Sequence, residues 1–135
     1  MRGRFGWTAA DVDAINAVEA RVWLDGPVAP EGRVSGAPRE LFLGMNDIAL
    51  RAEALGEELP PPAAYDRVGA ITVPTLVAYG DLDFPHFASR CEYLAATIPR
   101  ARLLRLPGVA HLPSVEAPAA VNDVLLPFLR EVRTS

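Results

Sequence analysis

Two short apolar runs in the second half of the chain, each followed by a helical pattern, constrain its fold most strongly. The first run covers residues 75–79 and ends at Gly80; the second covers residues 103–106 and ends at Pro107-Gly108. The first run does not alternate with polar residues, which predicts a strand buried on both faces. The order strand, helix, strand, helix requires two parallel strands joined by a right-handed crossover. This half therefore belongs to an open α/β sheet.

The helical patterns of this half lie at about residues 86–98 and 115–131. Pro99 ends the first of them. Apolar residues that recur at three- and four-residue steps are expected to face the sheet. They are Phe87, Cys91, Leu94, Ala95 and Ile98 in the first helix, and Val121, Leu125, Phe128 and Val132 in the second.

A helix-start signature near the N-terminus predicts an earlier helix. Thr8 is a favoured cap residue, and Asp11 stands three residues later, where its carboxylate can return a hydrogen bond to the cap. The helix should begin at Ala9 and end at the Asp-Gly-Pro sequence of residues 25–27. The residues expected on its inner side are Val12, Ile15, Val18, Val22 and Trp23.

A second helix should follow a loop over residues 26–38, with Pro38 near its start and Gly56 just past its end. The apolar face that we expect to pack inward consists of Leu41, Met45, Ile48, Ala52 and Leu55. Three consecutive prolines at residues 60–62 form a stiff connector. We therefore divide the chain into a helical segment, residues 1–62, and a strand-helix-strand-helix segment, residues 63–135.

Composition and charge exclude several classes of protein. Half of the 135 residues are apolar and 22% are charged, as in soluble globular chains, and no apolar run approaches the length of a membrane span. For this reason we expect a cytoplasmic protein that does not bind a membrane. We also expect no nucleic-acid partner, because the net charge is −4 and the 13 basic residues are arginines spread singly along the chain. Cys91 is the only cysteine, and the chain has no glycine-rich phosphate loop or metal-ligand spacing, so we expect no cofactor and no metal.

The residues to consider for chemistry follow the two predicted strands, because ligands of open α/β sheets gather at the carboxyl ends of the strands. Asp83 follows the first strand and His111 follows the second, and neighbouring parallel strands place these loops side by side. A carboxylate beside a histidine fixes its tautomer and stabilises the imidazolium. The alternative is that Asp83 caps the next helix while His111 satisfies a loop carbonyl.

At these loops the sequence resembles the α/β-hydrolase family. The family's acid loop is a strand ending in Gly-x-x-Asp, matched by residues 80–83, and its histidine loop is Gly-x-x-His followed by Glu-x-Pro, matched by residues 108–111 and 116–118. The Ile-Pro-Arg-Ala sequence of residues 98–101 is also similar to a turn of the family. The likeness covers residues 70–132, and the two helices before the connector are similar to the lid that such enzymes insert ahead of the acid strand.

The resemblance implies that Asp83 is the acid of a catalytic triad and His111 its general base. Asp81 occupies a variable position of the motif and is the less favoured acid. His86 lies in the acid loop without the family's histidine context, which favours a place at the opening of the site or in solvent.

The chain departs from the family at the nucleophile. These enzymes carry it on a Gly-x-Ser-x-Gly turn ahead of the acid, and no such turn exists here. None of the four serines, Ser35, Ser89, Ser114 and Ser135, follows a predicted strand, and Cys91 fits a packed structural thiol better than a nucleophile. A family sheet has eight strands and places about 150 residues before the lid and acid. Because only 82 residues precede Asp83, we expect a C-terminal fragment with an incomplete sheet, without the nucleophile and oxyanion hole.

Three hypotheses about function follow. The first is an esterase-like hydrolase of ester, lactone or carbon–carbon bonds with a Ser-His-Asp triad, acting on a small ester-like or lactone-like molecule, with a partner chain supplying the N-terminal half. Dehalogenases and epoxide hydrolases, which use an aspartate nucleophile, fall within the same resemblance. The second is a noncatalytic interaction module that pairs its open sheet edge with a partner chain. The third is a small enzyme that uses Asp83 and His111 with water alone.

Overall fold

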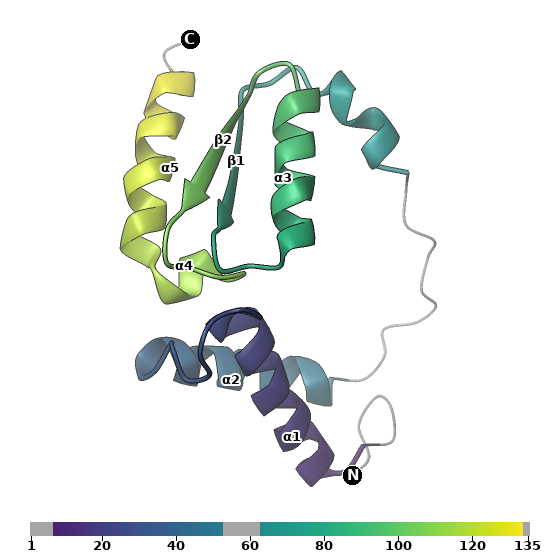
Figure 1. Cartoon of the computed structure of the whole chain (residues 1–135), viewed down its shortest axis with the longest axis vertical. Coiled ribbons are helices and arrows are strands. Elements are labelled where there is room, and N and C mark those ends of the chain that lie inside the picture. Colours follow the sequence, from purple (N-terminus) through teal and green to yellow (C-terminus); the bar gives the residue numbers. More distant parts are fainter. Residues whose placement is uncertain (1–6, 53–62, 134–135) are drawn as a thin grey trace.

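The computed structural model describes residues 7–52 and 63–133 (Figure 1). The proline connector at residues 60–62 and the expected end of the second helix, Leu55 and Gly56, lie outside these ranges. The elements in chain order are α1 (Ala9–Glu19), the π-helix η1 (Ala20–Asp25), α2 (Ala37–Arg51), the 3-10 helix η2 (Tyr65–Ala70), β1 (Thr75–Gly80), α3 (Pro85–Thr97), β2 (Ala101–Leu106), α4 (Pro113–Glu116) and α5 (Pro118–Arg133).

The two strands pair in parallel, as predicted, with a register that runs from Thr75 opposite Ala101 to Gly80 opposite Leu106. Figure 1 shows α3 and α5 on opposite sides of the strands, and the helices α1 and α2 beyond the strands' carboxyl ends. The fold class is therefore α/β with an open, two-stranded sheet in the described part of the chain. This arrangement places the N-terminal helices over the loops that carry Asp83 and His111.

The prediction that β1 is buried on both faces is wrong. Val77 and Gly80 are buried, but Ala78 is exposed and the other residues of the strand are half-buried. Among the described residues β2 is the only strand that pairs with β1, so one edge of β1 has no strand beside it. The continuous apolar run thus exceeds what the neighbouring elements cover.

The first helix begins as predicted. Thr8 and Asp11 form a reciprocal capping box, in which each side chain accepts the other's backbone N–H. The expectation that Val18 faces inward is wrong, because this residue is 62% exposed. The buried residues recur at four-residue steps, which places Val18 on the opposite side; they are Val12, Asn16, Ala20 and Leu24.

The expected inner face of the second helix is also wrong. Leu41, Met45 and Ile48 are exposed, and Phe42 is buried instead. Because residues 41–43 are all apolar, helical spacing alone does not choose the buried side. Phe42 joins a core with Ala20, Leu24 and Val34, against which Trp23, Leu43, Leu112 and Val115 pack. Two of these packing residues follow β2, so the N-terminal helices share their core with the histidine loop.

The last predicted helix, residues 115–131, is two helices. Ala117 separates α4 from α5 with non-helical backbone angles, φ −143° and ψ 59°. The cause is Pro118, because a proline disfavours helical geometry in the residue before it.

No helix among residues 7–52 and 63–133 is long and apolar enough to cross a membrane.

Candidate active site

The loops after the two strands are in direct backbone contact. Leu82 N–H donates to the carbonyl of Val109 at 3.0 Å. A Cβ atom on Gly80 would lie 2.2 Å from that same carbonyl oxygen and 2.3 Å from the carbonyl oxygen of Ala110. Only glycine permits this approach, which holds the acid loop against the histidine loop.

The structure brings Asp83 and His111 together. His111 Nδ1 lies 2.8 Å from Asp83 Oδ2, and the two side chains are 28% and 6% exposed. A carboxylate accepts the Nδ1–H proton, which leaves the lone pair on Nε2, the nitrogen that can act as a base. Asp83 is not the N-cap of α3, which is Phe84, but its Oδ1 accepts the backbone N–H of Phe84 at 2.7 Å. The hydrogen-bond partner of His111 among the described residues is the Asp83 carboxylate.

Aromatic rings confine the imidazole on two sides. The Trp23 ring, from η1, lies 4.8 Å from the His111 ring, and the Phe87 ring, from α3, lies 4.5 Å away at 68°. Phe84 packs edge-on against Trp23 at 5.4 Å. The general-base candidate is thus held between the N-terminal helices and the first helix after β1.

The two competing residues lie elsewhere in the same loops. Asp81 accepts a hydrogen bond from the backbone N–H of Gly108 at 2.7 Å and pairs with Arg105 at 3.4 Å, so it braces the loops instead of contacting the imidazole of His111. His86 is exposed, and its ring packs on Phe84 and Phe87.

The described hydroxyl and thiol groups make no hydrogen bond to His111. Ser89 donates to the carbonyl of Pro85 within α3, while Ser35 and Ser114 are exposed. Ser135 lies outside the described residues. Cys91 is half-buried, and burial together with the charges of Asp83 and Glu92 raises the pKa of its thiol. A neutral thiol is a poor nucleophile.

Two charged residues that support the site were not recognised from the sequence as doing so. Glu116, noted only as part of a motif, accepts a hydrogen bond from the backbone N–H of Ala110 at 2.6 Å and pairs with Arg33. Arg33 also donates to the carbonyl of Gly108 at 2.9 Å. Nothing in the sequence marks Arg33, because its partners are mostly backbone carbonyls.

Asp25 is a buried charge next to these residues. Its side chain is fully buried and accepts hydrogen bonds from the backbone N–H groups of Gly32 (2.8 Å) and Val34 (3.0 Å) and from the guanidinium of Arg39 (3.0 Å). Burial alone would raise the pKa of Asp25. The two amides and Arg39 outweigh it and hold that pKa below its ordinary value.

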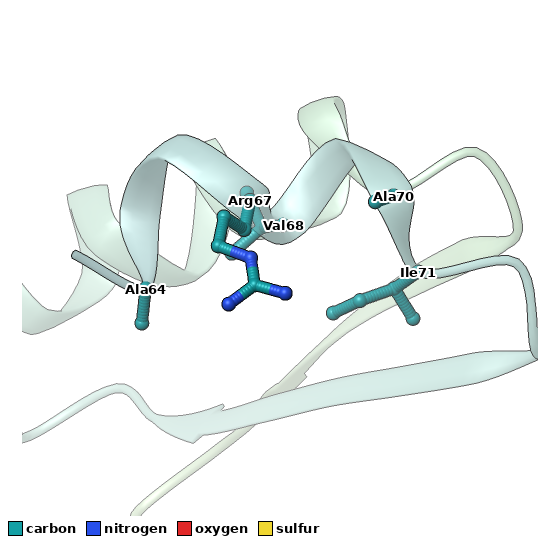
Figure 2. A pocket seen from close by; sticks show the side chains of 5 residues that line it. All are labelled: Ala64, Arg67, Val68, Ala70 and Ile71. Carbon is teal, nitrogen blue, oxygen red and sulfur yellow. The ribbon is translucent and has the colours of Figure 1, made fainter. Parts of the chain in front are cut away.

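Two hollows differ in their relation to the pair. One of about 300 Å³ is lined by Asp81, Asp83 and Arg105 among others, so it borders the acid and is of a size that small ligands occupy. Another of about 450 Å³ lies under η2, where Ala64 and Ile71 flank the Arg67 guanidinium (Figure 2). The helix η2 lies beside Thr97 at the end of α3, at the end of the sheet where the strands begin, so this hollow is remote from the carboxyl end of β1 (Figure 1). No group of three potential metal ligands occurs within the described ranges.

No protein-family model matches the chain, but solved structures do. It aligns with MenH from S. aureus over 92% of this chain and 53% of that one, with a TM-score of 0.60 and 18% identity. A thermophilic esterase aligns over 89% of this chain and 46% of its own, with a TM-score of 0.61 and 20% identity. A malate-bound thermophilic esterase from Thermogutta terrifontis aligns over 93% of this chain and 52% of its own, with a TM-score of 0.56 and 25% identity. The chain spans about half the length of these structures.

Proposed function

We propose that Asp83 and His111 are the acid and the general base of a hydrolase that works by acyl transfer, and that the chain is the C-terminal part of an α/β-hydrolase. The likeness of its fold to about half of each of the solved structures supports this. The observation that carries this proposal is the 2.8 Å contact between Nδ1 of His111 and Oδ2 of Asp83 at the carboxyl ends of two parallel strands. The substrate is a small ester-like or lactone-like molecule, or one with a carbon–carbon bond next to a carbonyl.

In the proposed mechanism, Nε2 of His111 takes the proton of a serine hydroxyl as its oxygen attacks the substrate carbonyl. The imidazolium that forms is stabilised by Asp83, and it gives its proton to the leaving group as the acyl-enzyme forms. A water molecule then attacks the acyl-enzyme by the same route and releases the acid and the serine. The low exposure of the Asp83 carboxylate strengthens its interaction with the imidazolium.

The serine and the oxyanion hole come from polypeptide outside the described residues. We propose that this polypeptide, either in the same protein or in a partner chain, pairs a strand with the edge of β1 that lies away from β2. Two observations support this: β1 has one strand neighbour in the described part of the chain, and more of its apolar run is exposed than a central strand would leave.

The experiment is coexpression of the full chain with the polypeptide encoded directly upstream of it, followed by an assay with p-nitrophenyl acetate. Asp83→Asn and His111→Ala should each lower turnover by at least about 10³-fold. His86→Ala is the matched control from the acid loop and should stay within about threefold of the parent. A fluorophosphonate probe should label a serine of the upstream polypeptide. Unchanged turnover in His111→Ala would overturn the proposal.

Among residues 7–52 and 63–133 no strand lies beside the second edge of β1, which also favours a second candidate, a noncatalytic module that pairs this edge with a partner strand. The two candidates differ in one measurement. A complex that is stable in light scattering, but neither hydrolyses the ester nor reacts with the fluorophosphonate, would favour the module.

A further inference from the structure

We propose that Arg33 and Glu116 form a clamp that sets the position of the His111 imidazole against Asp83, so that both are positioning residues for the general base. The inference rests on the proposed role of His111. Its consequence is that the N-terminal helices and the histidine loop act as one rigid unit at this point.

The first half of the clamp is Glu116. Its side chain is only 2% exposed, and its two carboxylate oxygens have different partners. Oε1 accepts the backbone N–H of Ala110, the fully buried residue directly before His111, and Oε2 pairs with Arg33. A charge-assisted bond to that amide fixes the backbone from which the imidazole extends.

The second half is Arg33, whose fork of donors reaches both halves of the chain. Nε and Nη2 donate to the carbonyls of Asp25 and Leu24, each at 2.7 Å, and Nη1 donates to Gly108 at 2.9 Å. The first two carbonyls belong to the last turn of η1, where helical partners are lacking. Arg33 thus closes a helix end and grips the histidine loop with one rigid group.

The same helix end carries Trp23, whose ring packs on His111 at 4.8 Å. The clamp therefore reaches the imidazole along two routes, through the backbone before it and through the indole beside it. Asp25 holds the clamp in place, because its carboxylate binds the backbone N–H groups of Gly32 and Val34, the residues on either side of Arg33.

A second ion pair with the same side-chain types provides a matched control. Arg102 and Glu131 meet at 3.0 Å on the surface, with side chains 52% and 61% exposed. Arg102→Met thus removes an arginine–glutamate pair of the same chain without touching either loop. Because the Arg102 guanidinium also lies 5.1 Å from the centre of the Phe128 ring, the variant reports the combined loss of an ion pair and a cation–π contact away from the loops.

The test reads the tautomer of neutral His111 by long-range ¹H–¹⁵N correlation on the full-length, ¹⁵N-labelled chain, without substrate. In the parent, the bond to Asp83 favours the Nδ1–H form, whereas a free imidazole favours Nε2–H. Arg33→Met should lower the ratio of Nδ1–H to Nε2–H by at least about threefold, and Glu116→Gln, which keeps an acceptor for Ala110, should have a smaller effect. Arg33→Lys should recover part of the ratio, and Arg102→Met should leave it unchanged.

Two outcomes would overturn the clamp. One is a parent-like ratio in Arg33→Met while the backbone spectrum shows a folded chain. The other is loss of the β1 and β2 amide signals in all three variants, Arg33→Met, Arg33→Lys and Glu116→Gln. This loss would make the pair a general stabilising contact. Asp83→Asn separates this inference from the proposed function: if it leaves the ratio unchanged, the Asp83–His111 pair itself has failed.

Discussion

The indole of Trp23 packs against the imidazole of His111 with ring centroids 4.8 Å apart, which joins the helices of the first half of the chain to the loop after the last strand. Sequence resemblance gave the N-terminal helices the place of a lid. The contact gives them a more specific role, since one of their side chains forms a wall of the candidate base's surroundings.

This contact predicts that the emission of Trp23 depends on the His111 side chain packed against it. His111→Ala should shift the tryptophan emission of the parent to longer wavelength, because loss of the ring lets water reach the indole. Trp23→Phe leaves Trp7 as the only tryptophan of the chain, and in that background His111→Ala should leave the emission unchanged. His86→Ala is the control and should leave the parent's emission unchanged. Parent-like emission in His111→Ala would show that the two rings are not in contact in solution.

The close approach of two carbonyl oxygens to Gly80 predicts that one added methyl group destabilises the folded chain strongly. In Gly80→Ala the new Cβ would lie 2.2–2.3 Å from two backbone carbonyl oxygens, which cannot rotate away as a side chain can. The free energy of unfolding, from urea titration by circular dichroism, should fall by about 2–4 kcal/mol.

The control for Gly80 is Gly44→Ala in the middle of α2, where nothing lies within 4 Å of the added Cβ. It should raise the free energy of unfolding by up to about 1 kcal/mol, because alanine favours a helix over glycine. Equal stability of Gly80→Ala and the parent would contradict the close contact of the two loops.

The strand pair and the approach of Asp83 to His111 could be predicted because both depend on local patterns. An apolar run bounded by glycine or proline marks a strand, and parallel neighbours bring their following loops together whatever lies between them in the sequence. The catalytic roles of the two residues stay predictions, because no described residue supplies the group that they would activate.

The buried face of α2 and the clamp could not be predicted, for physical reasons. Residues 41–43 are all apolar, so the choice of Phe42 over Leu41 is made by the partner core. Arg33 binds mainly backbone carbonyls, and every residue has one, so no residue type in the sequence marks its partners.

The lowered pKa of Asp25 predicts how the free energy of unfolding depends on pH. Its pKa is lower in the folded chain than the ordinary value near 3.9 that it has when unfolded. Its contribution is therefore fully present above about pH 4 and is lost as pH falls through the folded pKa. Asp25→Asn should reduce the free energy of unfolding at pH 7 by about 2–4 kcal/mol, because it weakens three bonds to a buried group.

In urea titrations the difference between Asp25→Asn and the parent should be the same at pH 7 and 5 and smaller at pH 3, since the contribution of the Asp25 charge is lost only below the ordinary pKa of the carboxyl. Asp13→Asn, at a side chain that is 70% exposed, is the control and should change stability little at any of these values. A constant difference from pH 7 to 3 would mean that the charge of Asp25 is not what stabilises the chain.

The surroundings of Cys91 predict that its thiol is alkylated slowly, and this rate tests whether the thiol is the nucleophile. Burial and the nearby charges of Asp83 and Glu92 raise the pKa of its thiol, so little thiolate exists at pH 8, and the side chain is half-buried. Iodoacetamide should modify it at least about tenfold more slowly than free cysteine, and the rate should rise in Asp83→Asn. In urea-unfolded chain the rate should match that of free cysteine. Fast alkylation of the folded chain that abolishes turnover of the coexpressed complex would instead make the thiol the attacking group, and the serine proposed to come from outside the described residues would be unnecessary.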